Sequence, residues 1–210
     1  MKSSVPQSCL KTKVFIAACL ASFVLLFVNV FQWPLTDILT PFLMLPLFGF
    51  VFFIMLLVML WSVVHAYKQR KSGRHALLPL SICIAAILAT IYVPFTRIWI
   101  TADFYLKKEE REEVVAKILS GQLLPNVSYN SKIITLPKGT SLSNGGNIVI
   151  ERVNNEEPYV FFFTFRGILD NYSGFLWVPK NGEASKFQDA GETGTEISPF
   201  GGNWFFIGHR

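Results

Sequence analysis

The sequence predicts a membrane protein of the α+β class, in which three transmembrane helices precede a connector helix and a small antiparallel β domain, either a sandwich or a small barrel. Of its 210 residues, 51% are hydrophobic and only 16% are charged, whereas soluble domains carry charge on about a quarter of their residues. Long uncharged runs fill the first half, and short strand-like runs fill the region after residue 130. We therefore expect a transmembrane anchor over 1–100, a juxtamembrane connector helix over 101–122 and an all-β domain over 123–210.

The net charge of +5 is divided unevenly along the chain. Residues 1–100 carry 8 Lys or Arg and one acid, and residues 101–210 carry 11 Lys or Arg and 13 acids. The basic excess thus lies between apolar runs, where it indicates membrane topology rather than a nucleic-acid surface. The composition excludes a disordered chain, a disulfide scaffold and a basic nucleic-acid module, so no nucleic-acid partner is expected.

Three apolar runs approach or exceed the roughly 20 helical residues that cross a bilayer. They cover residues 14–31, 42–64 and 77–96. Pro46 is expected to kink the second run. The first run has the basic start of a signal peptide, but no small-x-small cleavage site follows, which favours a signal anchor.

The distribution of basic residues predicts the orientation. The N-terminal tail and the loop at 65–76 share one side of an alternating topology, and seven basic residues lie there: Lys2, Lys11, Lys13, Lys68, Arg70, Lys71 and Arg74. Four lie on the other side near the third run: Arg97, Lys107, Lys108 and Arg111. The positive-inside rule then gives a multi-pass protein of the plasma (inner) membrane, with a cytoplasmic N-terminus, a short outward connection at 34–37 and residues 101–210 outside the cytoplasm.

The connector helix at 101–122 is predicted from its capping residues. Thr101 or Asp103 can accept a backbone N–H bond at its start, and Ser120-Gly121 supplies a stop. Its mixed-charge face, residues 107–113, is expected to be solvated, and its apolar stripe is expected to pack on the following domain.

Short strands separated by turn residues predict the β domain. The expected strands cover 132–136, 147–153, 158–169, 174–179, 185–188 and 203–208. Glycine pairs at 145–146 and 201–202 predict turns with positive φ, and Asn181-Gly182 predicts a two-residue hairpin. The absence of crossover helices favours an antiparallel sandwich or barrel.

The segment Tyr159 to Arg166 is expected to be a central strand, because apolar residues occupy both of its alternating faces and Arg166 ends it toward solvent. Residues 151–210 contain thirteen aromatic residues. At strand spacing these are typical of a core, and a ligand pocket is the alternative.

No catalytic, cofactor-binding or metal-ligating residue is predicted. The three histidines lack metal-ligand spacing, and the chain has no C-x-x-C, nucleophile elbow, P-loop or dinucleotide motif. An enzyme would require a carboxylate pair such as Asp170 and Asp189 to meet in a cleft. For Arg166 and Asp170 we expect a salt bridge or turn-capping role. The alternative is a partner or ligand contact that uses Arg166, Asp170 and Trp204.

These observations lead to a functional expectation of binding rather than catalysis. The sequence predicts a bacterial-type, membrane-anchored interaction protein, envelope-associated or immunity-like, whose partners are the lipid bilayer and a protein partner or a second copy of the chain. The alternative is a membrane-anchored effector or sensor whose β domain faces the cytoplasm, binds a small ligand and drives oligomerisation of the helices. A structural subunit of a larger membrane complex is a further possibility.

Overall fold

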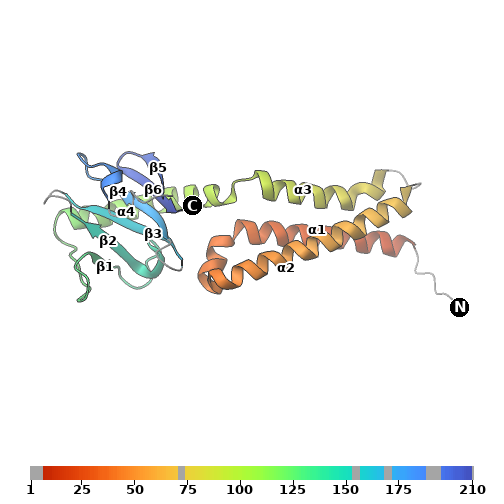
Figure 1. Cartoon of the computed structure of the whole chain (residues 1–210), viewed down its shortest axis with the longest axis horizontal. Coiled ribbons are helices and arrows are strands. Elements are labelled where there is room, and N and C mark those ends of the chain that lie inside the picture. The colour runs from red at the N-terminus through yellow and green to blue at the C-terminus, as the bar shows by residue number, and fades with distance from the viewer. Residues whose placement is uncertain (1–6, 71–73, 153–156, 168–171, 188–194, 210) are drawn as a thin grey trace. The chain divides into compact units, whose positions relative to one another are not determined.

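The computed structural model describes residues 7–70, 74–152, 157–167, 172–187 and 195–209 (Figure 1). The chain divides into two compact units, Met1–Trp99 and Ile100–Arg210. The first unit is helical, and the second contains most of one helix and a six-stranded sheet.

Three long helices form the first unit: α1 (Gln7–Val30), α2 (Gln32–Lys68) and α3 (Leu78–Tyr92). Each lies in a segment that is long and apolar enough to cross a membrane: Thr12–Val30, Gln32–Lys68 and His75–Tyr92. The prediction of three apolar helices of membrane-spanning length is confirmed.

The second apolar helix differs from the expectation at its start. Helix α2 has 37 residues and includes the predicted connection at 34–37. Its non-helical dihedral angles fall at Thr40 (φ 67°, ψ 155°) rather than at Pro46. Proline disfavours the helical conformation in the residue before it, so Pro41 accounts for a break at Thr40.

Small and apolar residues pack the three helices together. Their buried core contains Ala18, Leu25, Met55, Cys83 and Ala86, and small residues allow helices to approach closely. Large hydrophobic side chains cover the outer surfaces instead, including Phe23, Phe42, Leu45, Phe53, Leu60 and Ile91. Such a distribution is typical of helices that face lipid.

The fourth helix, α4 (Phe95–Leu119), begins six residues before the predicted connector. Val93 is extended (φ −85°, ψ 119°) before Pro94, which ends α3 at Tyr92 and lets a new helix start at once. Thr101 and Asp103 therefore lie inside the helix, and the prediction that one of them caps it is wrong.

The second unit is built on one antiparallel sheet of six described strands. These are β1 (Ile133–Thr135), β2 (Asn147–Glu151), β3 (Tyr159–Arg166), β4 (Tyr172–Trp177), β5 (Thr195–Gly201) and β6 (Trp204–His209), in the order β1-β2-β3-β4-β6-β5. The antiparallel β domain is confirmed, whereas neither a sandwich nor a barrel is.

Two strand predictions differ from the structure. Residues 185–188 were expected to form a strand, but Ala184–Lys186 is a 3-10 turn in which the Phe187 amide bonds to the Ala184 carbonyl. Strand β5 was not predicted, because Pro199 cannot donate a ladder hydrogen bond. Among the described strands β5 lies at an edge, where proline is tolerated.

Strand β3 is central and buried on both faces, as predicted. Tyr159 to Thr164 are all buried, and Arg166 at the end is exposed. On one face, Tyr159, Phe161 and Phe163 form a core cluster with Leu176, Val178, Ala184, Phe187 and Ile207. On the other, α4 packs through Phe104, whose ring lies 5.0 Å from Phe175 and 5.7 Å from Trp204.

Close packing also explains one glycine of β4. A Cβ on Gly174 would lie 2.1 Å from the carbonyl oxygen of Phe162 on the neighbouring strand. Only a residue without a side chain allows β3 and β4 to approach this closely.

Candidate functional site

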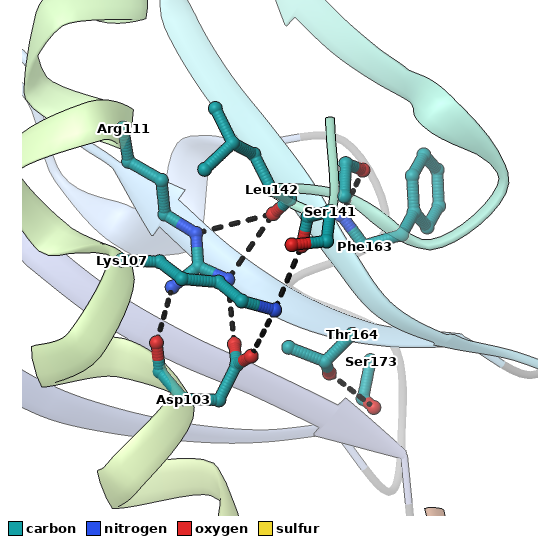
Figure 2. A network of polar contacts seen from close by, with 9 residues as sticks. Asp103, Lys107, Arg111, Ser141, Leu142, Phe163, Thr164 and Ser173 are labelled. Carbon is teal, nitrogen blue, oxygen red and sulfur yellow. Dashed lines mark hydrogen bonds and ion pairs between the residues drawn. The ribbon is translucent and has the colours of Figure 1, made fainter. Parts of the chain in front are cut away.

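A buried ion pair connects α4 to the loop before β2 (Figure 2). Arg111 is 1% exposed and Asp103, two turns earlier, is 7% exposed. The guanidinium donates to the Asp103 carboxylate at 2.6 Å and to its backbone carbonyl at 3.2 Å. It also donates twice to the Leu142 carbonyl, at 3.2 and 3.1 Å. Arg111 therefore holds the helix and the loop together.

Lys107 completes this network from the next turn of α4. Its ammonium lies 2.6 Å from the other Asp103 carboxylate oxygen and donates to the Ser141 carbonyl at 2.7 Å. The Arg111 guanidinium carbon lies 4.7 Å from the centre of the Phe175 ring. Burial lowers the pKa of Arg111, and the hydrogen bond to Asp103 opposes that shift. With its charge paired and its donors bonded, the network is suited to fixing the fold.

Two further sets of hydroxyl contacts lie near this network, in the sheet and the loop before β2 (Figure 2). The Ser143 hydroxyl donates to the Asn147 carbonyl and accepts a bond from the Phe163 amide at 2.9 Å. Thr164 and Ser173 pair across β3 and β4 at 3.1 Å. Within the described part of Ile100–Arg210, every buried side-chain nitrogen or oxygen has a partner.

A groove of about 370 Å³ lies between α4 and the turn that joins β5 to β6. The residues that line it include the buried Val115 and Trp204 and the half-buried Trp177. Lys108 and Glu112 of α4 line one side, and Gly201–Asn203 lines the other. This groove combines aromatic surface with exposed polar groups.

The three residues singled out in the sequence lie in different surroundings. Trp204 is 2% exposed and packs against Phe104 and Phe162, although it reaches the groove. Arg166 is exposed at the end of β3, with its guanidinium carbon 3.8 Å from the centre of the Phe163 ring. Desolvation against this surface lowers its pKa. Asp170 and Asp189 lie outside the described residues, so a contact through Arg166, Asp170 and Trp204 stays a prediction.

Of the groove residues, the sequence singled out Trp204 as a possible contact and Gly201–Gly202 as a turn, but it did not single out Lys108, Glu112 or Trp177. Lys108 and Glu112 belong to the predicted solvated face, and Trp177 resembles the core aromatics around it. The pairing of Lys108 with Glu112, four positions apart on a helix, was the available signal. This pairing could not indicate a groove, because β5 was not predicted and its last residue, Gly201, lines the side of the groove opposite α4.

Comparison with known proteins found no matching family model, curated protein or solved structure. The described residues contain no group of three or more His, Cys, Asp or Glu side chains placed to hold a metal ion.

Proposed function

We propose that this protein is a membrane-anchored, non-catalytic binding protein of the bacterial inner membrane, whose helix-backed β domain is presented outside the cytoplasm. The observation that carries the proposal is a contrast between the surface of the helical unit and the interior of the sheet unit. The three helices expose large hydrophobic side chains, as lipid-facing helices do. The sheet unit has its own aromatic core and a fully bonded buried network, as a stable binding platform requires.

The sidedness in this proposal is supported by the basic residues at the ends of the helices. Helix α2 ends at Lys68 and α3 begins at Leu78, so Arg70, Lys71 and Arg74 fall in the connection between them. Together with the basic N-terminal tail, this connection carries the positive excess that is retained in the cytoplasm. Because three spans are an odd number, the chain leaves the membrane on the side opposite its N-terminus. The sheet unit, which begins at residue 100, would then lie outside the cytoplasm.

A pair of matched cysteine substitutions tests this arrangement. In a background of Cys9→Ser, Cys19→Ala and Cys83→Ala, Gln69→Cys places a thiol after α2, and Gln122→Cys places one after α4. With a membrane-impermeant maleimide on intact spheroplasts, we expect labelling of the second variant at once and of the first only after permeabilisation.

The reverse pattern would overturn the proposed orientation and favour the alternative of a cytoplasm-facing effector that binds a small ligand and oligomerises. Immediate labelling of both variants would contradict the three-span anchor itself.

A further inference from the structure

The groove between α4 and the β5–β6 turn carries an exposed ion pair whose two groups are not hydrogen-bonded to each other. Lys108 Nζ lies 3.7 Å from Glu112 Oε1, beyond hydrogen-bonding distance, and the two side chains are 39% and 50% exposed. Exposed pairs of this kind contribute little to stability. Both charged groups can therefore turn toward a ligand at small cost to the fold.

The charge of the groove wall is balanced. One lysine and one glutamate face the same space, so an anion would be attracted by Lys108 and repelled by Glu112, and a cation would meet the opposite pair of effects. A neutral ligand that both donates and accepts hydrogen bonds satisfies both groups. Asn203, which is exposed on the facing wall, also offers both a donor and an acceptor.

The facing wall is tied to β4 by a backbone hydrogen bond and is open to a ligand. The Val178 amide donates to the Asn203 carbonyl at 2.8 Å, which fixes the turn to the end of β4. Gly201 and Gly202 have positive φ values of 103° and 60°, and a Cβ on either would meet nothing within 4 Å. A ligand can therefore approach the backbone of the turn closely.

We propose that this groove binds a neutral polyhydroxylated ligand, namely a sugar of one or two rings. Sugar hydroxyls both donate and accept, as the lysine, glutamate and asparagine require, and the C–H face of a sugar ring is apolar enough to pack on Trp177. The volume of about 370 Å³ falls within the range of small-molecule sites. The inference rests on the proposed binding role and assigns it a site and a ligand class.

The test is isothermal titration of the full chain in lipid nanodiscs, which avoid sugar-based detergents. The probes are maltose and N-acetylglucosamine, with inorganic phosphate as a charged comparison. We expect saturable sugar binding with a Kd on the order of 1 mM, as a small ligand with few contacts gives. Phosphate is expected not to bind.

Matched variants locate the site. Glu112→Ala should weaken sugar binding about tenfold, as loss of a charged hydrogen bond implies. Glu113→Ala should leave it unchanged, because Glu113 pairs with Lys117 at 3.9 Å on the same helix but does not line the groove. Ala116→Arg, at an exposed position in the groove, should abolish it.

Absence of saturable sugar binding would overturn the proposal, as would full binding by Ala116→Arg. Phosphate binding that strengthens in Glu112→Ala would reassign the groove to an anion. None of these results depends on thiol labelling at residues 69 and 122, so the proposed orientation and the proposed ligand fail separately.

Discussion

Removing one member of the buried ion pair should destabilise the sheet unit far more than removing an exposed one. Asp103→Asn keeps the shape of the side chain but leaves a guanidinium that is 1% exposed without its counter-charge. Breaking a buried pair in this way costs about 3–5 kcal/mol. Arg111→Met removes the charge and the donors to Leu142 and leaves a flexible, unbranched apolar side chain in their place.

The double variant separates the ion pair from the packing around it. In Asp103→Asn with Arg111→Met, no buried charge is left without a partner, so the loss of stability should be smaller than the sum of the two single losses. Residues in one network couple by about 0.5–3 kcal/mol. Lys107, which is 27% exposed and donates to the Ser141 carbonyl, is expected to keep that bond in all three variants.

Hydrogen exchange of the β3 amides measures the effect in the full chain, because exchange from buried strands reports the free energy of opening locally. A loss of about 3 kcal/mol corresponds to more than a hundredfold faster exchange. Lys117→Met, in an exposed pair with Glu113, is the control and should change the free energy by less than about 0.5 kcal/mol. Equal effects of Arg111→Met and Lys117→Met, or strictly additive losses in the double variant, would refute the reasoning.

Three further substitutions, one of them with a control, test packing, backbone strain and edge protection. Gly174→Ala should destabilise the sheet by more than about 2 kcal/mol, measured by exchange of the β3 amides, because its Cβ would lie 2.1 Å from a β3 carbonyl. Gly49→Ala, with open space around it, should leave the melting temperature unchanged or raise it. Thr40→Gly should raise the melting temperature in detergent, since a non-glycine residue at φ 67° costs about 1–3 kcal/mol; a lower value would contradict this strain. Asn126→Ala should speed amide exchange at Thr135, because the Asn126 side chain bonds both the amide and the carbonyl of that residue at 2.7 and 3.0 Å; unchanged exchange would exclude the protection.

The elements that depend on local pattern were predictable from the sequence. Uncharged apolar runs predicted three helices, and the two-sided apolar pattern of Tyr159 to Arg166 predicted a central strand. Glycine pairs predicted positive φ at 145–146 and 201–202, which the structure has. Each of these features follows from the pattern of a single continuous segment, so it can be predicted without knowing which distant residues pack against that segment.

Features that depend on distant residues were not predictable. Asp103 has the chemistry of a helix cap, and its role as the partner of Arg111 follows only from the earlier start of α4. Strand β5 contains a proline and becomes a strand because β6 pairs with it on one side. The Asn126 side chain bonds to the amide and the carbonyl of Thr135 at the outer edge of β1, a contact between residues nine positions apart.

The carbonyl of Leu142 gives the docking of α4 a unique register. Apolar burial is non-directional, so packing alone determines the register of a helix only loosely. The guanidinium of Arg111 determines it sharply, because a displacement by one turn, about 5.4 Å, would carry it away from the carbonyl that accepts two of its hydrogen bonds. The polar network therefore fixes the position of α4 along the sheet. The helix and the sheet are expected to move together as a rigid body rather than slide along each other.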